Sequence, residues 1–299
     1  MSVQSTAASA GDTPRGFAFA LVAYLLWGGM PLYLKALDHV PAVEVLAHRI
    51  IWSVPIALAV LLALGRTRDL RAAFASPRTL FMGAVTAALV SLNWGIYVWS
   101  IQSGQALEAA LGYYINPLFS IFLGAVLLGE RLTRRQWAAV ALAAGAVSIL
   151  TWETGRVPVV ALALPLSWGF YAFFKRTLPI GPNQGFTLEV MILTPFALAY
   201  LAWLHGQEAL FFAQAGSLDM ALLVGCGVVT AVPLMIYANG AKLLRLSTIA
   251  IMQYLTPTLI FLIAVFLFDE PFGQARAIAF PMIWLALVLY SSEVLRRRR

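Results

Sequence analysis

The stretch LFMGAVTAALVSLNWGIYVWSI, residues 80–101, carries no charged side chain over 22 positions. A helix needs about 20 mostly apolar residues to cross a bilayer, so this stretch predicts a membrane-spanning helix. Residues 247–268 form a second charge-free stretch of the same length. The whole chain of 299 residues is 61% hydrophobic and 11% charged, with a mean hydropathy of +0.84. Soluble domains are about 45–50% apolar and about 25% charged, so the composition excludes a soluble globular or disordered protein.

Further apolar stretches on both sides bring the predicted spans to ten. They cover residues 16–36, 44–64, 79–101, 105–128, 134–152, 157–177, 184–204, 219–243, 247–268 and 272–295. The connecting segments are short, so we expect an all-α membrane protein without a soluble domain. Residues 1–15 lack the features of a cleaved secretory signal and are predicted to be an N-terminal tail, and residues 296–299 a basic C-terminal tail.

The basic residues predict the orientation in the membrane. If the N-terminus is cytoplasmic, 16 of the 20 Lys and Arg residues fall on the cytoplasmic side. Lys35, Arg156 and Arg276 fall on the outer side, and Arg49 lies within a span. Cytoplasmic loops are enriched in Lys and Arg, so both termini are expected in the cytoplasm. The net charge of +7 therefore indicates membrane topology and contact with anionic lipid, and no nucleic-acid partner is expected.

Cysteine and histidine give no sign of a metal site or another cofactor. Cys226 is the only cysteine, which excludes an intramolecular disulfide and a cysteine-based metal site. The three histidines lie far apart in the sequence, which disfavours a histidine-rich site. No metal and no cofactor are expected.

The two halves of the chain match weakly but in order at an offset of 140 or 141 residues. The matches pair Trp27-Gly28 with Trp168-Gly169, Lys35 with Arg176, Pro55 with Pro195, Tyr97 with Tyr237, Tyr114 with Tyr254, Pro117 with Pro257 and Glu130 with Glu270. We therefore predict a first five-helix repeat over residues 16–153 and a second over 157–295. An odd number of spans inverts the second repeat, an architecture common in secondary transporters. Chance recurrence of these residue types is the alternative.

Several segments carry a resemblance to a known family. They are YLLWGG at 24–29, PLYLK at 31–35, EVLAHRIIWS at 44–53, NWGIYVWS at 93–100, EAALGYYINPL at 108–118, RLST at 245–248 and QYLTPT at 253–258. With them the chain resembles the RarD branch of the EamA, or drug/metabolite, transporter family. The resemblance implies two EamA repeats in a bacterial inner-membrane protein that exports small metabolites or drugs. No obligatory protein partner is inferred.

Polar and aromatic side chains within the spans are the predicted solute-binding residues, because lipid-facing positions stay apolar. They are Tyr24, Trp27, Asn93, Tyr97, Tyr113, Tyr114, Asn116, Trp168, Tyr171, Tyr237, Gln253, Tyr254 and Thr256. For the aromatic residues the alternative is an interfacial belt. Pro117 and Pro257 each free a backbone carbonyl, and we expect the resulting bends to line the site, unless neighbouring helices simply satisfy the kinks.

Few ionisable residues lie within the spans. His48, Arg49 and Glu108 are predicted to be structural or gating charges, with a role in solute or proton handling as the alternative. Arg49 and Glu108 lie at matching depth in the second and fourth spans, which predicts an ion pair between them. Glu189 has no partner that the sequence assigns.

These observations favour a secondary transporter over two alternatives. An intramembrane enzyme is disfavoured because the sequence contains no HExxH or GxSxG motif and no paired aspartates within the spans. The sequence also contains no Walker A motif, so ATP hydrolysis by the P-loop route is not expected. A non-transporting assembly or receptor protein would leave the inverted repeat and the polar residues within the spans without a use.

Overall fold

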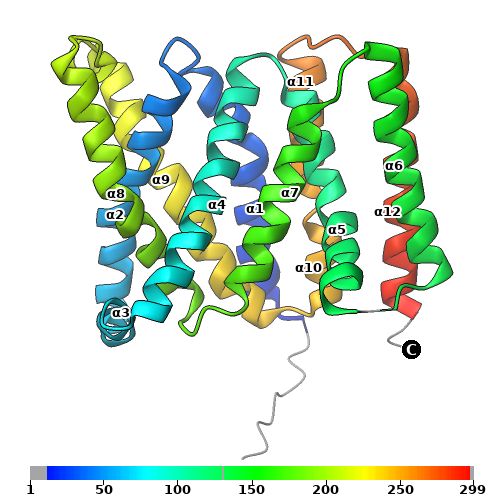
Figure 1. Cartoon of the computed structure of the whole chain (residues 1–299), viewed down its shortest axis with the longest axis horizontal. Coiled ribbons are helices and arrows are strands. Elements are labelled where there is room, and N and C mark those ends of the chain that lie inside the picture. The colour runs from blue at the N-terminus through cyan, green and yellow to red at the C-terminus, as the bar shows by residue number, and fades with distance from the viewer. Residues whose placement is uncertain (1–11, 130, 297–299) are drawn as a thin grey trace, which may run out of the picture.

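The computed structural model of the chain describes residues 12–129 and 131–296. Its helices run in the order α1 (Pro14–Lys35), α2 (Ala42–Ala63), α3 (Thr67–Phe74), α4 (Pro77–Gln102), α5 (Ala106–Leu128), α6 (Arg134–Thr154), α7 (Val159–Lys175), α8 (Pro182–Gly206), η1 (Phe211–Ala213), α9 (Ser217–Gly240), η2 (Ala241–Leu243), α10 (Leu246–Met252), α11 (Leu255–Phe266) and α12 (Gln274–Arg296). The long helices lie side by side in one bundle and run from one end of the molecule to the other (Figure 1). Residues 1–11 and 297–299 of the predicted tails, and Glu130 of the predicted repeat, lie outside the described residues.

The ten predicted spans are confirmed. Nine helical segments of the described chain are long and apolar enough to cross a membrane, and α7 is a shorter apolar helix of the same kind. The ninth span is made of two helices, α10 and α11, which follow each other with a short interruption. The small helix α3 was not predicted, and it lies at the end of the bundle where α2 and α4 are connected (Figure 1).

Local sequence signals fix several helix ends. The side chains of Thr13, Ser76 and Thr133 accept hydrogen bonds from the backbone N–H groups three residues later, which caps α1, α4 and α6. Gly129 and Gly155 follow α5 and α6 in left-handed conformation, which glycine adopts without a steric penalty. The short turns between spans therefore come directly from the sequence.

Helix contacts follow a symmetric pattern between the halves. Each span of the first half has a counterpart in the second half. When every span is replaced by its counterpart, the contact between α2 and α9 becomes the contact between α4 and α8, and the contact between α1 and α9 becomes the contact between α4 and α7. The pairs α2–α8, α5–α11 and α6–α12 convert into themselves. This pattern supports the inverted repeat, whereas the residue limits of the two repeats stay a prediction.

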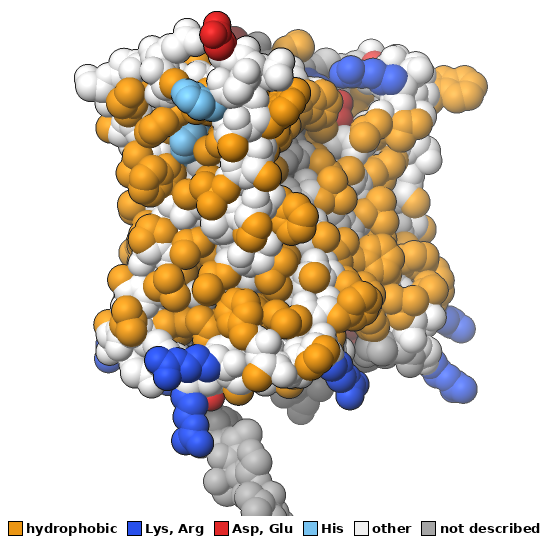
Figure 2. Space-filling view, turned by 60° about the vertical axis from the view of Figure 1, so that its left-hand side comes forward, with side chains coloured by type: hydrophobic (Ala, Val, Ile, Leu, Met, Phe, Trp, Pro, Cys, Tyr) orange, Lys and Arg blue, Asp and Glu red, His pale blue; other side chains and the backbone are white. Residues whose placement is uncertain are grey.

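The surface is apolar around the flank and charged at the ends. Figure 2 shows hydrophobic side chains over the flank, with most of the visible Lys and Arg at the lower end. Large hydrophobic residues such as Phe81, Trp152 and Phe196 are strongly exposed. Lipid is the environment in which such a flank is stable.

Candidate functional site

The structure divides the predicted solute-binding residues into separate clusters. Tyr24 and Trp27 of α1 pack against Tyr237 of α9, with ring centroids 5.4–5.8 Å apart. The hydroxyl of Thr256 donates to the carbonyl of Tyr24 at 3.1 Å, which ties α11 to this aromatic cluster. These four residues therefore lie together at the junction of α1, α9 and α11.

The ninth span is interrupted where its proline predicts a bend. Gln253 and Tyr254 lie between α10 and α11, and Pro257 is the third residue of α11. Proline has no N–H, so the carbonyl of Gln253, four residues earlier, loses its helical partner. The amide of Gln253 donates back to the carbonyl of Ala250 at 3.0 Å. The counterpart helix α5 continues through Pro117 without such a break.

Tyr114 points away from the other predicted site residues of α5. Its hydroxyl forms a 2.7 Å hydrogen bond with Thr258 of α11, and its ring contacts Phe280 and Trp284 of α12. Tyr114 therefore joins α5, α11 and α12. Asn116, two residues later, has a buried side-chain oxygen without a hydrogen-bond partner in the part of the chain that the structure describes.

Asn93 connects α4 to α7. Its amide donates to the carbonyl of Leu164 at 3.1 Å and to the hydroxyl of Ser167 at 2.9 Å. Trp168 and Tyr171 follow on the same helix, with ring centroids 5.2 Å apart. This group lies at the junction of α4, α7 and α8.

Glu189 of α8 is fully buried and has a cationic partner. The ammonium group of Lys175 lies 2.6 Å from one carboxylate oxygen, and the hydroxyl of Tyr171 donates to the other at 3.3 Å. Burial of a charge is tolerated when it is paired and hydrogen-bonded, as here. Lys175 is the partner that the sequence left unassigned.

Arg49 of α2 is buried at 2% exposure inside the bundle. Its Nε donates to the hydroxyl of Thr230 at 3.1 Å and its Nη2 contacts the sulfur of Met30 at 3.7 Å. The guanidinium carbon lies 5.3 Å from the centre of the Trp94 ring. Its Nη1 has no hydrogen-bond partner within the described part of the chain. Arg49 thus contacts α1, α4 and α9, which belong to both halves.

A close approach of α2 and α9 makes this arrangement possible. A Cβ on Gly227 of α9 would lie 2.2 Å from the carbonyl oxygen of Trp52, so only glycine fits. Thr230 and Arg49 each lie one helical turn from this contact on their own helices. Glycine at such positions lets helix backbones approach closely in membranes.

Two tyrosines complete the surroundings of Arg49. Tyr97 of α4 and Tyr113 of α5 have ring centroids 5.5 Å apart in an edge-to-face arrangement. Both hydroxyls lie within electrostatic range of the Arg49 guanidinium. The hydroxyl of Tyr97 is buried and has no partner among the described residues. We call Arg49, Trp94, Tyr97, Tyr113 and Thr230 the arginine cluster.

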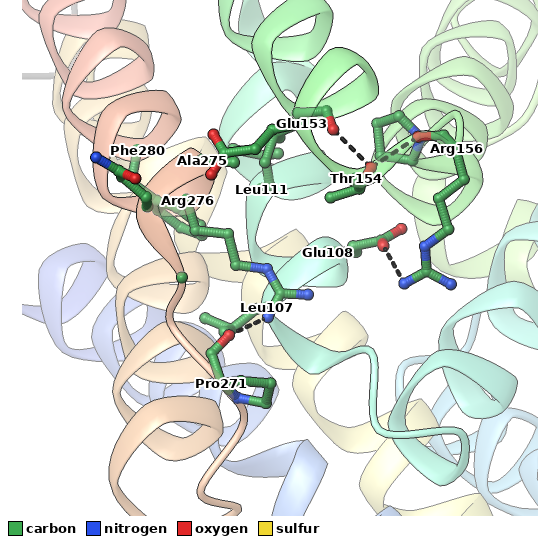
Figure 3. Close-up of a pocket in the computed structure, with 14 residues that line it drawn as sticks. Leu107, Glu108, Leu111, Glu153, Thr154, Arg156, Pro271, Ala275, Arg276 and Phe280 are labelled. Carbon is green, nitrogen blue, oxygen red and sulfur yellow. Dashed lines mark hydrogen bonds and ion pairs between the residues drawn. The ribbon is translucent and has the colours of Figure 1, made fainter.

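The predicted ion pair between Arg49 and Glu108 is wrong. Glu108 pairs with Arg156 at 3.6 Å, at the rim of a cavity of about 300 Å³ between the ends of α5, α6 and α12 (Figure 3). Arg276 lines the same cavity and donates to the carbonyl of Pro271. The two side chains do not lie at the same depth, because Arg49 is the eighth residue of α2 whereas Glu108 lies in the first turn of α5.

His48 lies beside a buried carboxylate at the start of α2. Its Nδ1 accepts from the indole of Trp52 at 3.1 Å, and its Nε2 lies 4.0 Å from Glu44. Both oxygens of Glu44 accept backbone N–H groups, those of Phe211 and Phe212 in η1. Glu44 thus attaches α2 to the segment between α8 and α9.

Comparisons with known proteins agree with this architecture. The model of the EamA-like transporter family matches residues 14–152. An uncharacterized transporter of Vibrio cholerae is 43% identical over 294 residues, which cover 95% of this chain and 94% of that protein. Protein RarD of Escherichia coli is 37% identical, with 96% and 97% covered. The chain belongs to the RarD branch of the EamA-like, or drug/metabolite, transporter family.

One further relative and one solved structure complete the comparison. The chloramphenicol-sensitive protein RarD of Pseudomonas aeruginosa is 34% identical, with 95% of this chain and 97% of that protein covered. A solved crystal structure superposes with a TM-score of 0.59 at 21% identity and covers 95% of this chain and 98% of the other. This last likeness shows the fold alone. Membership of the RarD branch makes the chain a multi-pass membrane transporter.

Sequence reasoning missed several residues that the structure places at these sites. Thr230 is a polar residue within a span and shares that signal with Thr256, which was predicted. Met30 offers no such signal, because methionine is common on lipid-facing and buried helix faces alike. Lys175 was counted only as a cytoplasmic basic residue. A solute-binding role of the predicted residues stays a prediction, as does the absence of a cofactor; no group of three or more potential metal ligands occurs in the described part of the chain.

Proposed function

We propose that this RarD-branch protein is a secondary transporter that exports a small metabolite or drug-like solute across the bacterial cytoplasmic membrane by alternating access. The observation that carries the proposal is the arginine cluster, where helices of both halves meet around a buried polar side chain. Inverted repeats place substrate sites at the repeat interface, near the middle of the membrane. Exchange of conformations between two such halves opens a central site to each side in turn.

The proposed orientation places both termini in the cytoplasm. It rests on the basic residues, of which 16 of 20 fall on one side of the ten-span topology. A C-terminal alkaline phosphatase fusion is then expected to be inactive, and a C-terminal fluorescent protein fluorescent. An active phosphatase at this position contradicts the orientation.

Solute flux tests the transport function. Purified protein in proteoliposomes is expected to move a member of a panel of amino acids and amphenicols in a saturable manner, whereas an enzyme or an assembly protein is not. Empty liposomes give the background. Absence of saturable flux from protein that elutes as a single folded species contradicts the proposed function.

A further inference from the structure

Arg49 carries a buried positive charge that no carboxylate of the described residues neutralises. Its partners are a hydroxyl, a thioether and an aromatic ring, and the described residues place no carboxylate within 4.0 Å of its guanidinium. The groups that interact electrostatically with it include the hydroxyls of Tyr97 and Tyr113 and the thiol of Cys226. Arginine does not lose its proton in proteins, so the charge persists.

Burial of an unpaired charge is costly, and such residues within membrane spans mark sites of function. Arg49 is the eighth residue of α2, which places it about 10 Å from the nearer helix end. That depth is too great for a side chain held by Thr230 to reach the membrane surface. A ligand that carries the opposite charge removes the cost.

We propose that Arg49 binds a carboxylate group of the transported solute, an inference that rests on the proposed function of this site. Among the described residues the Nη1 has no partner and the Nη2 has only the weak sulfur acceptor of Met30, so both terminal nitrogens are available. A carboxylate fits this edge of a guanidinium with two parallel hydrogen bonds. The hydroxyl of Tyr97, which has no partner among the described residues, interacts electrostatically with Arg49 and offers a further donor.

The surroundings define the rest of the solute. One cation balances one negative charge, so a monoanion leaves the site neutral whereas a phosphate dianion leaves a buried excess charge. Trp94, Tyr97 and Tyr113 line the cluster with aromatic surface. An apolar or aromatic body packs well against such a surface. The class is therefore a small monocarboxylate with an apolar or aromatic body.

Ligand-induced thermal stabilisation of the purified protein tests this inference without transport. The probes are benzoate, phenylacetate and indole-3-acetate, each compared with its uncharged amide. At least one carboxylate is expected to raise the midpoint of thermal unfolding in a saturable manner, and its amide to bind about ten- to a hundredfold more weakly. A result in which no carboxylate stabilises the protein, or in which amides do so equally, overturns the inference.

Variants assign the effect to Arg49. Arg49→Met is expected to lose the response to the carboxylate, and Arg49→Lys to keep a weaker one, because lysine keeps the charge but lacks the planar fork. Arg68→Met is the matched control, since Arg68 is exposed on α3, and it is expected to respond as the wild type does. A full response from folded Arg49→Met overturns the inference.

The flux assay separates this inference from the proposed function. Stabilisation by a carboxylate without flux of any solute leaves the binding site in place and contradicts transport. Saturable flux of a neutral or cationic solute that Arg49→Met leaves unchanged supports transport and overturns the carboxylate site.

Discussion

Arg49 and Glu189 lie 140 positions apart, and each is the eighth residue of its helix, so they occupy corresponding places in the two halves. Their surroundings differ in kind. Glu189 has the ammonium group of Lys175 at 2.6 Å, whereas Arg49 has a threonine hydroxyl at 3.1 Å and no acidic partner in the described residues. The second half neutralises its buried charge, whereas the first half leaves its buried charge without a counter-ion among the described residues.

The residues of the first helix in each half account for this difference. At the offset of 141 that aligns Trp27 with Trp168, the first-half counterpart of Tyr171 is Met30, and that of Lys175 is Leu34. The second half thus has a hydroxyl and a cation where the first half has a thioether and an alkyl group. The positions that supply partners for the buried charge in the second half supply no strong partner for the buried charge in the first half. Local exceptions of this kind are typical of functional sites.

The largest expected effect concerns the buried ion pair between Lys175 and Glu189. Lys175→Met leaves Glu189 as a buried carboxylate without its cation, and removal of one partner of a buried pair costs about 3–5 kcal/mol. We expect a clear fall in the midpoint of thermal unfolding of the purified protein. The double variant Lys175→Met with Glu189→Met removes both charges and is expected to return close to wild-type stability. Equal losses in the single and double variants would show that the pair itself does not matter.

A smaller effect is expected for Glu108, whose ion pair is intermediate between the buried pair of Glu189 and the absence of an acidic partner for Arg49 among the described residues. Its carboxyl is mostly buried, but the side chain of its partner Arg156 is 65% exposed, so water screens the pair. Pairs of this kind contribute about 0–1 kcal/mol. Glu108→Gln is therefore expected to shift the unfolding midpoint far less than Lys175→Met does. A loss as large as that of Lys175→Met contradicts this description of the cavity in Figure 3.

The smallest effect concerns Asp12, a carboxylate outside the spans that has N–H and O–H donors. The backbone N–H of Arg245 and the hydroxyl of Thr248 hold the pKa of Asp12 below its usual range. A lowered pKa stabilises the folded state above the ordinary carboxylate pKa, and this contribution is lost as the pH falls through the lowered value. Asp12→Asn is expected to be slightly less stable than wild type at neutral pH, with the difference shrinking below about pH 4. A difference that grows on acidification contradicts this.

The sequence predicted the spans well because their signal is local. A run such as residues 80–101 needs no knowledge of its neighbours to be recognised as a membrane helix. Bends were predicted at Pro117 and Pro257 alike, because each proline removes a helical hydrogen bond, but this signal did not distinguish the interrupted ninth span from α5, which continues through Pro117. The helix α3 was missed because its eight residues are too short for a periodicity argument.

The site was predicted less completely because its contacts depend on which helices adjoin. Tyr24 with Tyr237, and Tyr97 with Tyr113, were named as candidates and lie in contact. The partner of Arg49 was assigned wrongly because the sequence fixes neither where each helix begins nor which helices adjoin: Glu108 lies in the first turn of α5, whereas Arg49 lies two turns into α2. Thr230 reaches Arg49 because Gly227 lets α9 approach α2 closely. No local sequence pattern predicts this contact.

The central claim, that Arg49 is kept for a ligand and not for the fold, is tested most directly by the thermal unfolding of solute-free Arg49→Met beside Lys175→Met. Methionine is of similar length and removes a buried charge that has no acidic partner among the described residues, and with it the cost of burying that charge. The account predicts that Arg49→Met unfolds at or above the wild-type midpoint while Lys175→Met unfolds well below it. A fall for Arg49→Met as large as that for Lys175→Met would contradict the account, because Arg49 would then be part of what holds the helices together.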